Sequence, residues 1–206
     1  MANVILIVKF SFEECRVGKS QKDKAESHDR IVQVAAARFR EAGIDGIGVA
    51  DPMKDAGMTH GGFYRHFASR EELVTEGVEQ ALSDGGRVVE TLANSDQASL
   101  KILVDGYLST MHRDNLTSSC AVTTLVSDIT RSNDRARSAY TRQVGLYVAL
   151  LTKLIAGEKQ KKKRTKAISA LATLVGALSM ARAVNDETLS REILKSAADE
   201  LKTQLG

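Results

Sequence analysis

The stretch at residues 57–73, GMTHGGFYRHFASREEL, decides the fold of the N-terminal part of this chain. It contains Phe63, Tyr64 and Phe67, three of the chain's 5 Phe and 4 Tyr residues, and there is no Trp. Two adjacent glycines precede these aromatic residues, although a glycine inside a helix costs about 1 kcal/mol relative to alanine. So much aromatic mass beside bare backbone indicates a helix that is held from behind while its front admits a close neighbour.

The residues before this stretch predict a long amphipathic helix. Apolar side chains recur every three or four positions across residues 31–42, and charged side chains take the opposite face. The helical pattern begins at about Lys22, and we expect Ser27 to cap the helix and Gly43 to end it.

Two short helices should follow the first one. The second ends at Gly57, where a left-handed residue lets the chain turn sharply, and the third begins after Thr59, whose hydroxyl can cap it. Pro52 has no amide hydrogen to donate, so either the first turn of the second helix is distorted or that helix starts later, with Asp51 as its cap. Two short helices joined by a tight turn, behind a first helix, are the pattern of a helix-turn-helix.

The rest of the chain also has helical patterning. Ser69 and Glu72 form a capping box at the start of a long fourth helix. Five more helices are expected at about 97–113, 119–132, 134–156, 164–184 and 187–204. The predicted fold class is all-α with about nine helices, divided into a flexible N-terminal arm at 1–21, a three-helix helix-turn-helix domain at 22–72 and a larger helical domain at 73–206.

Overall charge does not point to a nucleic-acid partner. The chain has 29 Lys and Arg against 26 Asp and Glu, a net charge of +3. The run at 159–166, KQKKKRTK, holds six of those cations, so the remaining 23 basic residues face 26 acidic ones. We expect this run to be a solvated loop between helices, and any nucleic-acid contact has to be argued from local pattern.

That local pattern separates the core side of the third helix from its exposed side. Phe63 and Phe67 are one helical turn apart and share a face, which we expect to pack into the core. The expected phosphate contacts are the hydroxyl, guanidinium and imidazole donors of Tyr64, Arg65, His66 and Arg70. The expected base contacts lie at the exposed start of the third helix, at Thr59, His60 and Gly61.

Residues 22–74 resemble the DNA-binding domain of the TetR/AcrR family of one-component repressors. The motifs that carry the resemblance are A-G-M-T at the turn, G-x-F-Y-x-H-F and S-R-E-E-L, in that order and at the family's spacing. The resemblance implies a homodimer, built from the last two helices, that binds a palindromic double-stranded DNA operator and is released by a small-molecule effector. The alternative is a helical ligand-binding or scaffold protein of the same fold that no longer reads DNA.

An effector cavity in the larger domain would have apolar walls with a few polar groups. The candidate ligand-binding residues are Tyr107, Met111, Tyr147 and Leu174, and an ordinary core position is the alternative for each. Small residues at 167–181 and a leucine-rich seam at 189–201 predict a four-helix bundle formed by two chains. Packing within one chain is the alternative for these two helices.

Other classes of protein are not supported by the sequence. Cys15 and Cys120 match no disulfide framework or metal motif, and a thiol sensor at Cys120 is a minor alternative to a buried apolar role. No catalytic motif is present, so we expect no catalytic residue, no cofactor, no metal and no enzymatic activity. The N-terminus lacks signal-peptide features and the apolar stretch 167–181 is too short to span a bilayer, so we expect a cytoplasmic protein without membrane contact.

Overall fold

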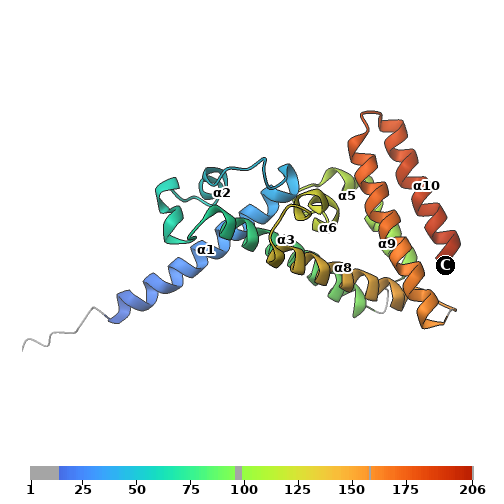
Figure 1. The fold of residues 1–206 in the computed structure, drawn as a ribbon, viewed down its shortest axis with the longest axis horizontal. Helices are drawn as coiled ribbons and strands as arrows, with labels where there is room; N and C mark the ends of the chain where they lie inside the picture. Colours follow the sequence, from blue (N-terminus) through green and yellow to red (C-terminus); the bar gives the residue numbers. More distant parts are fainter. Residues whose placement is uncertain (1–13, 96–98, 158, 206) are drawn as a thin grey trace, which may run out of the picture.

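The computed structural model describes residues 14–95, 99–157 and 159–205, with side chains from Gln21 onward. The described residues form ten α-helices and one 3-10 helix and contain no strand, which confirms the predicted all-α fold. Figure 1 shows an elongated molecule, with the N-terminal helices at one end and the last two helices at the other.

The N-terminal domain is built from α1 (Glu14–Ala42), α2 (Ala50–Asp55), the 3-10 helix η1 (His60–Arg65) and the first turns of α3 (Arg70–Ala93). α1 packs against α3 and α2, and η1 packs on α2. The core between these elements is apolar and includes Ile31, Ala35, Phe39, Met53, Phe63, Phe67, Leu73 and Val78.

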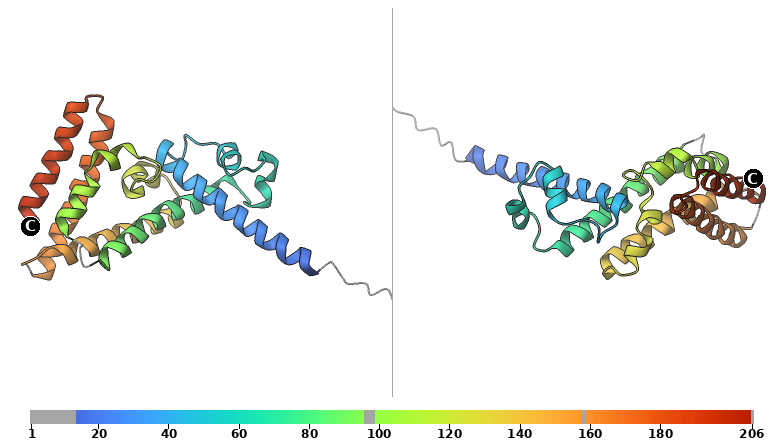
Figure 2. Two further views of the ribbon diagram at one scale, coloured as in Figure 1. Left: turned by 180° about the vertical axis from the view of Figure 1, so that it is seen from behind. Right: turned by 90° about the horizontal axis from the view of Figure 1, so that it is seen from above.

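The larger domain continues from α3 through seven further helices: α4 (Leu100–Tyr107), α5 (Thr110–Asp114), α6 (Ala121–Thr124), α7 (Val126–Ile129), α8 (Asp134–Leu154), α9 (Gln160–Ala183) and α10 (Glu187–Leu205). α8 packs along α3 and against α9, and α10 packs on α9 and α4. Figure 2 shows from two further sides that α3 and α8 run next to each other between the two ends of the molecule. α3 therefore belongs to both domains and joins them as one continuous helix.

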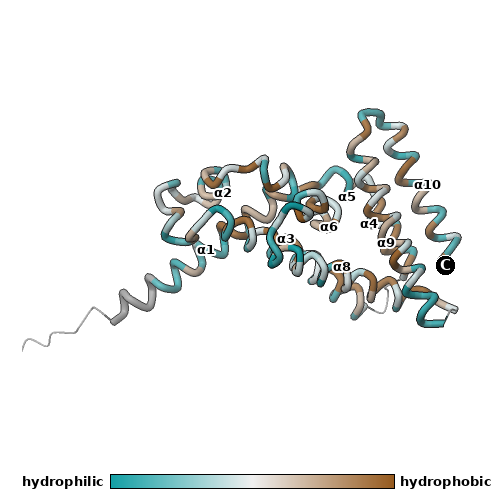
Figure 3. The backbone as a smooth tube through the Cα atoms, viewed as in Figure 1, coloured by the Kyte–Doolittle hydropathy of each residue, from teal (hydrophilic) through white to brown (hydrophobic). Residues whose placement is uncertain are grey.

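Apolar residues gather where the helices of the larger domain meet. Figure 3 shows hydrophobic positions along α4 and α9, whereas the first turns of α9 are hydrophilic. Of the described helices, α9 is the one whose length and composition would permit it to cross a bilayer, with 39% of its most apolar window buried. In this fold α9 packs against α4, α6, α8 and α10, which is the position of a core helix.

α1 begins earlier than predicted. Within the predicted arm, residues 14–21 are helical and continuous with the rest of α1, while residues 1–13 lie outside the described residues. Ser27 is not an N-cap, because it lies inside α1 and its hydroxyl donates to the Asp23 carbonyl at 2.7 Å. The apolar period starts only where α1 meets the core, while the Lys, Glu, Gln and Ala residues before it favour helix without core contacts. The period therefore marks the buried part of α1 and not its beginning.

α2 begins at Ala50, so Pro52 is its third residue and Asp51 does not cap it. The first amides of a helix have no carbonyl partner within it, so Pro52 costs α2 no hydrogen bond. The Asp51 carboxylate instead accepts from the Gly48 amide at 3.2 Å. Met53, the residue after Pro52, is fully buried in the core of the N-terminal domain.

Three other segments differ from the prediction. The predicted helix at 97–113 forms α4 and α5, because the Ser109 hydroxyl caps α5 by accepting from the His112 amide at 3.1 Å. The predicted helix at 119–132 forms α6 and α7, which meet at Leu125. The basic run at 159–166, expected as a loop, forms the first turns of α9, because its Lys, Arg and Gln residues are good helix formers.

α1 and α3 approach each other most closely at Gly77. A Cβ atom at this position would lie 2.6 Å from Phe39 Cε2 and 3.3 Å from Ala35 Cβ. Phe39 is 2% exposed and is surrounded by the core, so its ring has little room to move away. The absence of a side chain at Gly77 thus sets the distance between the two helices.

Replacing Gly77 by Ala is expected to lower the free energy of unfolding by about 1–3 kcal/mol, the usual cost of overpacking a core. The matched control is Gly145→Ala in α8, where an added Cβ atom meets nothing within 4 Å. This control should stabilise the protein by about 0.4–1 kcal/mol, because alanine restricts the unfolded chain. Urea unfolding of both variants measures the difference, and equal stability of the two would show that the α1–α3 contact tolerates a methyl group.

Candidate functional site

The turn between α2 and η1 is built by backbone hydrogen bonds around Gly57. Gly57 has a φ of +76°, the left-handed conformation that the sequence predicted. The Gly57 amide donates to the Lys54 carbonyl at 2.9 Å, and the Met58 amide donates to the Met53 carbonyl at 2.8 Å. Thr59 is the N-cap residue of η1, but its side chain makes no capping hydrogen bond, so the predicted role of its hydroxyl as a cap is wrong.

The two phenylalanines hold η1 against the core, as predicted. Phe63 is 2% exposed and Phe67 is 1% exposed, and their ring centroids lie 5.5 Å apart. On the other side of Phe67, the His28 ring of α1 stacks on it at a centroid distance of 4.6 Å. η1 is thereby fixed with its opposite face outward.

Gly61 leaves one exposed position of η1 without a side chain. A Cβ atom at Gly61 would meet nothing within 4 Å, and one at Gly62 would make only ordinary contacts of 3.6 Å or more. Neither glycine has a positive φ. The packing of this chain therefore does not require glycine at either position, and the space in front of Gly61 is open to a partner.

Most of the predicted DNA-contact residues share this exposed face. Tyr64 is 80% exposed although its ring meets Phe63 edge-on at 5.2 Å, which leaves the hydroxyl in solvent. The other exposed members of the predicted set are Thr59, His60, Gly61 and Arg65. The structure thus brings five of the seven predicted residues together on η1 and its N-cap residue.

His66 and Arg70 are placed differently. His66 is half-buried, its Nδ1 atom is buried without a hydrogen-bond partner, and burial together with the nearby His28 and Lys24 lowers its pKa. One terminal nitrogen of Arg70 donates to the Ile44 carbonyl at 2.8 Å and to the Ile47 carbonyl at 3.2 Å. Arg70 therefore fastens the α1–α2 loop in addition to lying at the N-terminus of α3.

The capping box at the start of α3 has the predicted members. The Ser69 hydroxyl accepts from the Glu72 amide at 3.2 Å. The Glu72 carboxylate reaches back to the amide of Ala68, one residue before the cap, rather than to the cap itself. This second hydrogen bond keeps the Glu72 carboxylate at the N-terminus of its own helix, α3.

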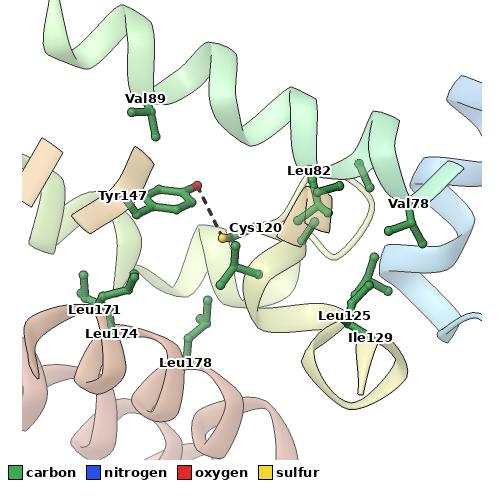
Figure 4. Close-up of a cluster of buried hydrophobic side chains, with 14 of the residues drawn as sticks. Val78, Leu82, Val89, Cys120, Leu125, Ile129, Tyr147, Leu171, Leu174 and Leu178 are labelled. Carbon is green, nitrogen blue, oxygen red and sulfur yellow. Dashed lines mark hydrogen bonds between the residues drawn. The ribbon is translucent and has the colours of Figure 1, made fainter. Parts of the chain in front are cut away.

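Three of the four predicted ligand-binding residues lie in the core of the larger domain. Figure 4 shows Tyr147 and Leu174 facing the same interior as Cys120, whose thiol lies 3.5 Å from the Tyr147 hydroxyl. The Tyr107 hydroxyl pairs with Thr123 Oγ1 at 2.6 Å. Burial raises the pKa of both tyrosines, so both phenols stay neutral. Met111 is 78% exposed and does not join this core.

A polar network borders this core, and the sequence reading missed its central member, Arg182. The Arg182 guanidinium donates to the carbonyls of His112 at 2.7 Å and Arg113 at 3.0 Å, and also to the Ser119 hydroxyl. His112 in turn pairs through Nδ1 with the Tyr107 carbonyl at 2.7 Å and through Nε2 with Ser119 at 3.0 Å. The available signal was that Arg182 is the one charged residue between positions 167 and 183.

Arg40 joins the two domains and was also missed. It is 8% exposed, and it donates to the Thr117 carbonyl at 2.7 Å and to the Asp84 carboxylate at 2.9 Å. A buried ion pair of this kind is sensitive to any movement of either partner. Arg40 links the last turn of α1 to the loop that leads into α6.

Comparison with known proteins identifies the N-terminal domain. Residues 31–76 match the family model described as "Bacterial regulatory proteins, tetR family". This part of the chain is therefore a tetR-family domain. The matched residues run from the buried face of α1 through η1 into α3, and therefore contain the whole exposed face of η1.

One relative and several solved structures extend this result. A stretch of 93 residues is 28% identical to the uncharacterized HTH-type transcriptional regulator YfiR of Bacillus subtilis (strain 168), covering 45% of this chain and 43% of that protein. The match thus spans less than half the length of that relative. E. coli NemR in its reduced form has a TM-score of 0.69 at 19% identity, covering 86% of this chain and 96% of NemR. A TetR transcriptional regulator from Chloroflexus aurantiacus J-10-FL has a TM-score of 0.72 at 22% identity, covering 88% and 95%. At these identities the structures show a shared fold.

The titration of His112 gives a pH-dependent prediction. Burial, with a contribution from the Arg182 cation, lowers the pKa of His112 below its ordinary value of 6.5. The unfolded chain therefore binds this proton more readily than the folded protein, so the histidine reduces stability as the pH falls below about 6.5.

Replacing His112 by Leu should cost about 1–3 kcal/mol of stability at pH 7.5, because the network around it loses its partners. The loss should be smaller at pH 5.5. At that pH the wild type is itself destabilised, because its unfolded chain binds a proton at His112 more readily than the folded protein does, and the variant has no such histidine. Urea unfolding at both pH values measures this. A loss for His112→Leu that does not vary with pH would contradict the assignment.

Proposed function

We propose that this tetR-family protein is a DNA-binding transcriptional regulator, a repressor that a small-molecule effector releases from a palindromic operator. The observation that carries the proposal is the outward face of η1. Phe63 and Phe67 hold the helix from behind, while Gly61, where an added Cβ atom would meet nothing within 4 Å, leaves its front open for a close approach. A short helix presented in this way after a tight turn is the recognition element of a helix-turn-helix.

The chemistry of the exposed face supports the contact assignments. Tyr64 and Arg65 offer a phenolic hydroxyl and a guanidinium that can donate to phosphate oxygens. Thr59 and His60 can donate to and accept from base edges in the major groove, and Gly61 leaves room for a thymine methyl group. The amides that open α3 add an anion site beside Arg70.

Exposed apolar residues on the last two helices support the homodimer. Ile168 and Met180 on α9 are 50% and 55% exposed, and Leu189 at the start of α10 is 43% exposed. Apolar side chains on two adjacent helices can form a four-helix bundle with the same helices of a second chain. Two copies would read two half-sites about 34–36 Å apart, which compensates for the small contact set of one copy. Because the proposed partner is operator DNA, we infer that the protein works in the cytoplasm.

An effector in the larger domain would act by favouring a dimer whose η1 helices are wrongly spaced for DNA. Tyr107, Tyr147 and Leu174 supply the apolar walls and hydroxyl groups for its site. Arg40 offers a direct connection from this domain to α1, because its partner Thr117 lies in the loop before α6. Coupling between effector and operator of about 1–3 kcal/mol is typical of such regulators.

Replacing Arg65 by Ala should weaken binding to every duplex by about tenfold or more, because a charge-assisted hydrogen bond to phosphate is lost. The slope of log affinity against log salt should decrease by about 1 for each lost contact. The matched control is Arg164→Ala, an exposed arginine on the first turns of α9 at the far end of the molecule. Mobility-shift titrations on operator DNA selected from genomic fragments measure both effects.

Replacing His60 by Ala should instead change which sequence is selected, by about 1–3 kcal/mol at one base position. If Arg65→Ala and Arg164→Ala bind equally well, η1 does not face DNA. If the wild type selects no sequence at all, the chain is a helical ligand-binding or scaffold protein of this fold.

The double change Ile168→Glu and Met180→Glu should convert the dimer into monomers, because two charges would be buried without partners in the bundle. Val88→Glu, at a 56% exposed position on α3, is the control and should leave the dimer intact. Sedimentation equilibrium distinguishes the two results, and a stable dimer in the double variant would place the interface on other helices.

A further inference from the structure

A cleft of about 480 Å³ lies between the N-terminal domain and the larger domain, away from the apolar core of Figure 4. One wall comes from the α1–α2 loop and the first turns of α3, and the other comes from α7 and the start of α8. The lining residues used below are Ile44, Asp45, Arg70, Glu71, Val74, Asp128, Arg131 and Ala136. The volume is within the usual range of small-molecule sites, which is about 300–1,000 Å³.

The two walls are joined by hydrogen bonds that hold the cleft in shape. The Asn133 side-chain amide, at the N-cap of α8, donates to Thr75 Oγ1 at 2.9 Å and to Glu71 Oε1 at 3.2 Å, both on α3. Farther along the same two helices, Arg135 pairs with Glu79. The cleft is therefore a formed space whose two walls are linked by hydrogen bonds and an ion pair.

The carboxylates of the cleft are poorly neutralised. The Asp128 side chain is 14% exposed, and its one ion-pair partner among the described residues is Arg131, at 3.4 Å and 63% exposed. Asp45 is solvent-exposed and takes part in none of the hydrogen bonds or ion pairs found among the described residues. Glu71 accepts from the neutral Asn133 amide. Asp128 is half-buried and its cationic partner is long and solvent-exposed, so this carboxylate retains part of its desolvation cost, which a second cation would reduce.

The two arginines of the cleft set the net charge that a ligand must match. One terminal nitrogen of Arg70 donates hydrogen bonds to the Ile44 and Ile47 carbonyls, and Arg70 forms none of the ion pairs found among the described residues. Together with Arg131 it contributes two positive charges against the three negative charges of Asp45, Glu71 and Asp128. The cleft thus carries one net negative charge, and Ile44, Val74 and Ala136 add apolar surface to its walls.

We propose that this interdomain cleft binds a small aliphatic molecule bearing one ammonium group, which is held between Asp128 and Asp45 while its carbon chain lies against Val74. The ammonium replaces the long Arg131 contact at Asp128 and gives Asp45 a partner. Such a molecule contacts both domains at once. If the chain binds DNA as proposed above, the ligand also biases the orientation of η1 relative to α8, because it favours one arrangement of the two walls.

The test uses the full-length protein without DNA, so its result does not depend on the proposed DNA binding. The probes are n-butylamine, butyrate and n-butanol at pH 7.5 and constant ionic strength, and the readout is the thermal unfolding midpoint as a function of probe concentration. A ligand that binds only the folded protein raises this midpoint in a saturable way. We expect a saturable rise for butylamine and none for the other two probes.

Asp45→Asn and Asp128→Asn should each shift the half-saturating concentration of butylamine upward by about tenfold, the effect of about 1.4 kcal/mol. Asp45→Asn removes no existing hydrogen bond and therefore should fold normally. Glu90→Gln, an exposed carboxylate on α3 outside the cleft, is the matched control and should bind butylamine as the wild type does. The proposal is overturned if butylamine gives no saturable rise, if butanol or butyrate gives the same rise, or if both aspartate variants respond like Glu90→Gln.

Discussion

The close contact between α1 and α3 at Gly77 is the constraint on which the rest of the structure depends. A missing side chain at this one position lets the Phe39 ring lie against the α3 backbone, with a hypothetical Cβ atom only 2.6 Å from the ring. α3 then continues from the N-terminal domain along α8 into the larger domain. The orientation of η1 relative to the helices that carry the candidate effector core therefore depends in part on α3, whose packing against α1 requires the missing side chain at Gly77.

Different interactions fasten η1 and the two domains. η1 is held by apolar burial of Phe63 and Phe67, which is insensitive to direction and can anchor a helix of only six residues. The domains are joined by directed polar contacts, with Arg40 reaching from α1 to Thr117 and Asn133 reaching from α8 to α3. Directed contacts have a narrow range of good geometry, so a change on either side of the junction alters their energy. η1 is thus held within its domain by apolar contacts, while directed polar contacts hold the junction between the domains.

The polar groups inside the larger domain divide into two sets. The phenols of Tyr107 and Tyr147 stay neutral. The Tyr107 hydroxyl pairs with Thr123 and the Tyr147 hydroxyl with Cys120, so each has an uncharged partner. The charged set lies at the edges: Arg182 is held by carbonyls near α5, and Asp128 lies in the interdomain cleft. The separation leaves an apolar core with neutral polar groups at one place and a charged cleft at another.

The sequence by itself determined the all-α fold, the turn at Gly57, the capping box at Ser69 and the exposed set on η1, because each depends on residues within one or two helical turns. It also predicted Phe63 and Phe67 as the buried pair, since spacing alone puts them on one face. Only the tertiary structure decided that α1 extends back to Glu14, that Met111 lies in solvent, and that Arg182 and Arg40 are buried polar links. It alone also brought Asp45 and Asp128 to one cleft. These features depend on which helix faces which across long sequence separations, and a period of three or four residues carries no information about that.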